Sequence, residues 1–254
     1  MPRGISRFDE MLIQQDIQLV GQQVINYENI NDPFFSNVVF LLHGNGTNGS
    51  TIINDNSIFP KNITRVGDTQ ISTTQAKFGG SSIYFDGAGT PTDRLTIPVN
   101  TDPFQFGSGD FTIESWVYRL NTNTSAIFAG QSDLTTAAGS STVFYLSSTA
   151  TSDLYIGNVG SAVASPNPSI NTWAHVAWVR RGNTFYSFLN GTLLGSTSVI
   201  GSVNLGTPTY PNTIGSFATN STGFNGYMNE YRITKGIGRY TANFTPPTAP
   251  FPDF

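Results

Sequence analysis

The 254-residue chain contains no cysteine, which excludes disulfide bridges and thiolate metal sites. Charged residues are also scarce, at 11% of the chain, and the longest basic run is the pair Arg180-Arg181. We interpret this pair as an exposed strand end, so no nucleic-acid partner is predicted. The first ten residues lack the apolar core of a signal peptide, and no run approaches the ~20 apolar residues of a membrane span. We therefore expect no membrane insertion.

Catalytic side chains are few. Retaining glycosidases need two carboxylates about 5–5.5 Å apart, yet none of the four glutamates, Glu10, Glu28, Glu114 and Glu230, share a strand-length segment. Folding can still bring Glu114 and Glu230 together, but each is better explained as a sheet carboxylate with a neighbour such as Arg232. Of the two histidines, His43 and His175, neither accompanies a nucleophile elbow. The sequence therefore predicts no enzyme, and a structural role for His175.

Aromatic residues, at 13%, together with 26 glycines and 14 prolines, are typical of many strands joined by turns. Residues 111–118 alternate with period two, which places Phe111, Ile113, Ser115 and Val117 on one face of a strand. The pair Asn190-Gly191 between two apolar runs predicts a tight hairpin. No segment after residue 35 has helical periodicity, so residues 36–254 are predicted to form one sandwich or barrel.

Residues 1–35 differ from the rest in composition. Ile13, Ile17, Val20 and Val24 recur at 4-3-4 spacing, the apolar seam of a helix. We predict a docking or oligomerisation arm that partner subunits order, because an isolated helix of this length is marginal. An amphipathic element or strand packed on the sandwich is the alternative.

Five motifs occur in order along the chain, and they resemble the signatures of laminin-G-like, concanavalin A-like domains. They are Phe-Gly-Ser-Gly-Asp-Phe-Thr-Ile-Glu-Ser-Trp-Val at 106–117, Trp-Ala-His-Val-Ala at 173–177, Leu-Asn-Gly at 189–191, residues 224–236 and Arg-Tyr-Thr-Ala-Asn-Phe-Thr-Pro-Pro at 239–247. The resemblance implies an all-β fold, a concanavalin A-like jelly-roll sandwich of two antiparallel sheets. It also places Trp116 and Trp173 in signature strands, so we expect both in or beside the core.

This version of the family is common among phage proteins, so the resemblance implies a non-catalytic structural or display protein of a tailed phage virion. Capsid decoration, neck and tail fibre are all open. Such a protein is assembled in the host cytoplasm, lies on the virion surface, binds other virion proteins through its arm and forms homo-oligomers. Contact with host cell-surface polysaccharide is a further expectation. The alternatives are a lectin-like adhesion module and a degenerate glycoside hydrolase.

Two kinds of binding residue follow from the resemblance. Calcium is the usual metal of this fold, and Asp86, Asp93 and Asp110 are the candidate ligands for a structural ion. Relatives often have aspartate where this chain has Asn45, Asn190 and Asn229, which weakens such a site, and turn chemistry also explains Asp86-Gly87. No other cofactor is predicted.

Glycan binding needs exposed aromatic rings flanked by asparagine and aspartate. The candidates in turn-rich stretches are Tyr210, Phe217, Phe224 and Tyr227. For each residue, a place in the core is the alternative.

Overall fold

The structure, a computed structural model, describes residues 31–89, 91–98, 106–122, 125–130, 142–146, 151–156, 160–198, 212–216 and 223–254. The docking-arm residues Ile13, Ile17, Val20 and Val24 lie outside these ranges, as do Tyr210 and Phe217. Within the described part, no helix is long and apolar enough to cross a membrane.

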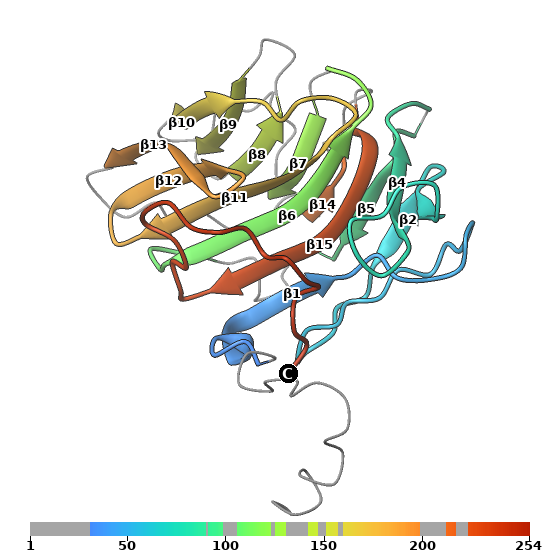
Figure 1. Cartoon of the computed structure of the whole chain (residues 1–254), viewed down its shortest axis with the longest axis horizontal. Coiled ribbons are helices and arrows are strands. Elements are labelled where there is room, and N and C mark those ends of the chain that lie inside the picture. Colours follow the sequence, from blue (N-terminus) through green and yellow to red (C-terminus); the bar gives the residue numbers. More distant parts are fainter. Residues whose placement is uncertain are drawn as a thin grey trace, which may run out of the picture.

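Two antiparallel sheets are packed against each other (Figure 1), which confirms the predicted all-β sandwich. Among the described residues, the first sheet has eight strands. Seven follow the order β13 (Thr192–Ser198), β12 (Thr184–Leu189), β11 (Trp173–Arg181), β6 (Phe111–Arg119), β15 (Asn225–Lys235), β4 (Ser82–Asp86) and β3 (Gln70–Ser72). The eighth, β1 (Val38–Leu42), follows the short 3-10 helix η2 (Phe35–Asn37) and pairs with β15.

The second sheet has seven strands in the part of the chain that the structure describes. Its order is β10 (Gly160–Pro166), β9 (Thr151–Ile156), β8 (Thr142–Leu146), β7 (Ser125–Gly130), β14 (Asn212–Ile214), β5 (Arg94–Ile97) and β2 (Thr64–Val66).

The main core lies between the sheets, and period-two alternation decides which side chains enter it. On β6, Phe111, Ile113 and Val117 belong to the main core cluster and Ser115 is fully buried, as the sequence pattern predicts. Residues of β6 with even numbers point to the outer face of the eight-stranded sheet. This outer face is therefore where the remaining aromatic and charged side chains of the strand gather.

The C-terminal tail, residues 236–254, crosses part of that outer face (Figure 1). Tyr240 and Phe244 pack on a cluster that contains Phe188, and Phe251 packs on β1. The predicted hairpin has Asn190 and Gly191 at its turn, with φ of 49° and 75°. The same turn also contacts the tail. A Cβ atom at Gly191 would collide with the Phe244 carbonyl oxygen, so glycine serves both the turn and the tail.

A bulge divides β15 into two halves that pair with different strands. Residues 225–228 pair with β4, residues 231–234 pair with β1, and the register against β6 shifts between Asn229 and Arg232. Glu230 lies in the bulge with a φ of 53°. The shift sets Arg232 directly opposite Glu114 on β6 and directs Glu230 toward β1 instead.

Candidate functional site

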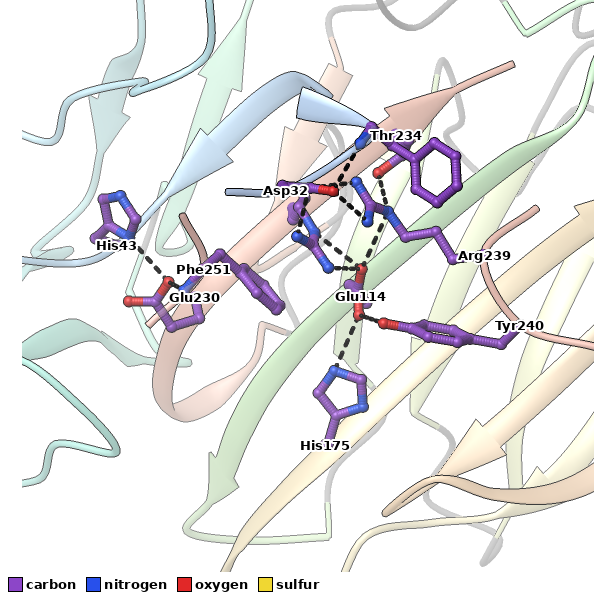
Figure 2. Close-up of polar contacts among 11 residues, drawn as sticks. Asp32, His43, Glu114, His175, Glu230, Thr234, Arg239, Tyr240 and Phe251 are labelled. Carbon is purple, nitrogen blue, oxygen red and sulfur yellow. Dashed lines mark hydrogen bonds and ion pairs between the residues drawn. The ribbon is translucent and has the colours of Figure 1, made fainter. Parts of the chain in front are cut away.

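Glu114 is the centre of a buried polar network on the outer face of the eight-stranded sheet (Figure 2). Its Oε1 atom accepts hydrogen bonds from Arg232 Nε at 2.9 Å and Nη2 at 2.7 Å. Its Oε2 atom accepts one from the Tyr240 hydroxyl at 2.9 Å and lies 3.2 Å from His175 Nε2. Both carboxylate oxygens are thus occupied by protein groups.

Asp32 extends this network to the segment before β1 (Figure 2). Its Oδ2 accepts from Arg232 Nη1 at 2.9 Å and from Arg239 Nη2 at 2.6 Å, while Oδ1 accepts from Arg239 Nη1 at 2.9 Å. Arg232 belongs to β15 and Arg239 to the tail. The network therefore ties the segment around Asp32, the sheet and the tail together, and it reaches across the boundary predicted at residue 36.

The electrostatics of Glu114 are those of a structural ion pair. Burial opposes its ionisation, but the positive charge of Arg232, followed by the contact with His175, lowers the pKa of Glu114 well below its usual range. Burial and the neighbouring Glu114 charge raise the pKa of Tyr240, so its hydroxyl remains a donor. Arg232 was the partner expected from the sequence; the contribution of Asp32 was not foreseen.

Glu230 forms a separate contact on the β1 side (Figure 2). Its Oε2 atom lies 2.8 Å from His43 Nδ1 and accepts a hydrogen bond of 2.9 Å from the Phe251 backbone N–H. Burial acts against protonation of His43, but the bond to Glu230 outweighs it and raises the pKa of His43. Glu114 and Glu230 are thus buried in two clusters with different partners, an arrangement that serves packing of the tail rather than paired-carboxylate chemistry.

The three candidate calcium ligands do not form one site. Asp93 accepts hydrogen bonds from the backbone N–H groups of Asp68 and Asp86, the latter at 2.9 Å, so it braces a turn. Asp110 accepts from Gly182 N–H at 2.7 Å, at the opposite end of β6 from the Asp86 pairing region. Nine residues of strand span roughly 30 Å. Within the described ranges, no three His, Cys, Asp or Glu side chains gather as a metal site.

The two described glycan candidates are buried. Phe224 is 1% exposed and packs edge-on against Phe85 in the main core, because its ring turns inward before β15 begins. Tyr227 is 7% exposed and points to the outer face of the sheet. Phe224 thus takes the core place that was the alternative to glycan binding, since turn-rich sequence context does not reveal the side to which a ring points.

Strand register nevertheless places Tyr227 within a line of aromatic side chains. Tyr227 is directly opposite Tyr84 of β4 on one side and Tyr118 of β6 on the other, and Tyr118 is opposite Trp173 of β11. The ring centroids lie 4.9 Å, 5.9 Å and 5.6 Å apart in that order. We call Tyr84, Tyr227, Tyr118 and Trp173 the aromatic row; it crosses four neighbouring strands, about 14 Å at the usual strand spacing.

Three of the four side chains of the aromatic row are accessible to solvent, and Tyr227 is the buried exception. Tyr84, Tyr118 and Trp173 are each half-buried. Within the described part, Trp173 Nε1 and Asn225 Oδ1 have no hydrogen-bond partner, but both atoms are buried, so it is the ring surfaces of the row that face a ligand.

Three of the four row residues, Tyr84, Tyr118 and Trp173, were not foreseen from the sequence as binding residues. The signal was present, because Tyr84, Tyr118 and Trp173 alternate with core residues along their strands. What was missing was the register that lines them up. Trp116 was expected in or beside the core; at 6% exposure it is buried on the outer face, under Lys77 and edge-on to Phe78.

Residues 88–236 match the family model of the concanavalin A-like lectin/glucanases superfamily, and the chain belongs to this superfamily. No curated protein matches the sequence significantly.

Solved structures with the same fold are distant in sequence. The binding domain of Paraclostridial mosquitocidal protein 1 is 17% identical with a TM-score of 0.56, and the receptor-binding domain of botulinum neurotoxin D is 12% identical with a TM-score of 0.59. Each match covers 81% of this chain, which spans about half of either toxin domain, 50% and 51% respectively. Domain 4 of an extracellular arabinanase from Geobacillus stearothermophilus, solved with arabinotriose, is 15% identical with a TM-score of 0.50; the match covers 78% of this chain and 92% of that one.

Proposed function

We propose that this domain is a non-catalytic, lectin-like module that binds a polysaccharide with the aromatic row. The observation that carries the proposal is the register of four strands, which aligns Tyr84, Tyr227, Tyr118 and Trp173 on one face. A line of rings suits an extended sugar chain, because the apolar faces of successive sugar rings can pack on it. The arabinotriose complex of the similar arabinanase domain supports this ligand class.

A binding role is preferred over catalysis because the buried carboxylates are already paired. Glu114 and Glu230 are 0% and 1% exposed, and protein groups bond both. A glycosidase acid must reach the leaving oxygen and its partner the anomeric carbon. Neither carboxylate is placed for that task, so the degenerate glycosidase is the least supported alternative.

Replacing Trp173 with alanine is expected to weaken glycan binding by at least about tenfold, since a half-buried stacking ring at the end of the row is lost. A panel of neutral oligosaccharides that includes arabinotriose would identify a ligand, and titration calorimetry would compare the variants. Phe254→Ala, which removes an exposed ring in the tail, is the matched control. Equal affinity of Trp173→Ala and the natural protein would contradict binding at the row.

We further propose that the module is displayed on a tailed phage virion. The resemblance of its motifs to phage-type members of the family supports this setting, and the apolar seam Ile13, Ile17, Val20 and Val24 supports attachment through residues 1–30. A chain that begins at residue 31 keeps Asp32 and hence the network under the tail.

That truncated chain is expected to keep its melting temperature and to be absent from purified particles. Mass spectrometry of particles assembled with each form, with the full chain as the control, gives the readout. Normal incorporation of the truncated chain would refute attachment through the arm.

A further inference from the structure

The long connection between β1 and β2 forms a rigid loop without regular secondary structure. Asp55, buried at its centre, accepts backbone N–H bonds from Leu41 at 3.0 Å, Ser57 at 2.9 Å and Lys61 at 2.8 Å. The Asn56 N–H also donates to the Leu41 carbonyl oxygen at 2.7 Å. The Asp55 carboxylate thus ties residues 55–61 of the loop to β1, and this part of the loop surface is preorganised before any ligand arrives.

This loop exposes large apolar side chains that are not packed in the core. Phe59, Ile52 and Ile58 are 77%, 70% and 44% exposed. They are three of the six exposed large apolar side chains in the described part of the chain. Their concentration in one pinned loop indicates a contact surface, because scattered exposed residues need no explanation but a cluster does.

A furrow of about 460 Å³ runs along the same loop. Its polar lining includes Thr51, Asn54 and Asn62, and its apolar lining includes Ile53 and Ile63. A smaller hollow of about 120 Å³ adjoins it through Ile53 and Asn54, and is lined in addition by His43, Asn45 and Asn56. The asparagine amides supply both hydrogen-bond donors and acceptors, and the side chains of Ile53 and Ile63 supply an aliphatic surface in the same furrow.

The charges of the loop narrow the ligand class. The carboxylate of Asp55 is engaged with three backbone N–H groups, and the Lys61 ammonium lies against the Phe59 carbonyl oxygen. The carboxylate is therefore not free to bind a cation, and a single lysine among the lining residues does not by itself make an anion site. Amides with a hydroxyl, an aliphatic floor and an open phenyl ring match a neutral sugar, whose hydroxyls pair with amides and whose apolar face stacks on a ring.

We propose that the furrow, with Asn54 and Asn62 in its walls and the exposed Phe59 directly before its lining residue Pro60, is a second binding site for neutral oligosaccharide. It shares no residue with the aromatic row and does not depend on the row being a glycan site. Two sites on one rigid domain let a single polysaccharide chain or two branches be held with higher avidity than either site provides.

The test is a backbone amide NMR titration of the full chain with arabinotriose, cellotriose, maltotriose, mannotriose and chitotriose. The expected result is that at least one of them shifts the resonances of residues 51–63. Phe59→Ala and Asn54→Ala should each weaken that interaction by at least about tenfold. Because Phe59 is largely exposed, its replacement is expected to leave the melting temperature unchanged.

Two variants separate this site from the row. Trp173→Ala is expected to leave the shifts in residues 51–63 intact, and Phe59→Ala is expected to leave any shifts in Tyr84, Tyr118 and Trp173 intact. Absence of shifts in residues 51–63 with all five sugars overturns the proposal. It is also overturned if Phe59 is required instead for binding to vesicles of phosphatidylcholine and phosphatidylglycerol, or for pull-down of a particle protein in the absence of sugar.

Discussion

Replacing Arg232 with alanine is expected to lower the free energy of unfolding by about 3–5 kcal/mol. The guanidinium group bonds Glu114 and Asp32 at once, and all three side chains are buried. Its removal leaves the buried Glu114 carboxylate without the guanidinium that bonds its Oε1 atom, while Asp32 keeps its bonds from Arg239. Urea unfolding at pH 7 gives the measurement, and Tyr240→Phe is the matched control, because it removes a single hydrogen bond from Glu114 and should cost about 1 kcal/mol.

The same variant should change the response to acid. The folded protein holds the pKa of Glu114 and of Asp32 below their ordinary values, for Glu114 chiefly through Arg232 against the effect of burial. A lowered pKa contributes stability above about pH 4 that is lost as the pH falls through the folded value. In Arg232→Ala, the effect of burial on the pKa of Glu114 is no longer opposed by the Arg232 charge. Protonation of Glu114 in acid then removes an unfavourable buried charge.

The natural protein should therefore lose stability between about pH 5 and pH 2, whereas Arg232→Ala should lose less or gain. His43 acts in the opposite sense, since its raised pKa gives stability that is present below about pH 6.5 and is lost as the pH rises through the folded value. A loss below about 1 kcal/mol for Arg232→Ala at pH 7, or an unchanged acid response, would show that the network does not hold the tail as described.

Replacing Trp178 with alanine is expected to cost about 3–5 kcal/mol as well, for a different reason. Trp178 is the largest fully buried side chain of the described residues, and it lies in the main core opposite Ile113 of β6. Alanine leaves a cavity that neighbouring strands cannot close without breaking their ladder hydrogen bonds.

Thermal and urea unfolding of Trp178→Ala measure this cost. Ile170→Ala, at a half-exposed position just before β11, is the control and should stay within about 0.5 kcal/mol. A cost below about 1 kcal/mol for Trp178→Ala would mean that the two sheets repack easily around this position.

The outer face of the eight-stranded sheet is divided between stability and recognition. The tail and the Asp32 segment cover the half that contains Glu114, His175 and Arg232. The aromatic row lies two residues further along the same strands, beyond His175 and Trp116. Because the covered half anchors β6, β11 and β15, it keeps the row in line without occupying it.

Local features of the sequence determined the class of fold. Period-two alternation in residues 111–118 and the Asn190-Gly191 turn identified strands and a hairpin that the structure confirms. Both signals depend only on neighbouring residues and backbone sterics, so they can be read without knowing the partners of a strand.

Only the tertiary structure decided which residues meet. Glu114 and Arg232 are 118 residues apart in sequence, Arg232 and Asp32 are 200 apart, and a bulge at Glu230 sets the register that joins the first pair. The same register aligns Tyr84, Tyr227, Tyr118 and Trp173, and the turn of the chain before β15 buries Phe224. Pairing between distant strands is settled by the packing of the whole sandwich, because alternation gives the face of each side chain but not its neighbour across the strands.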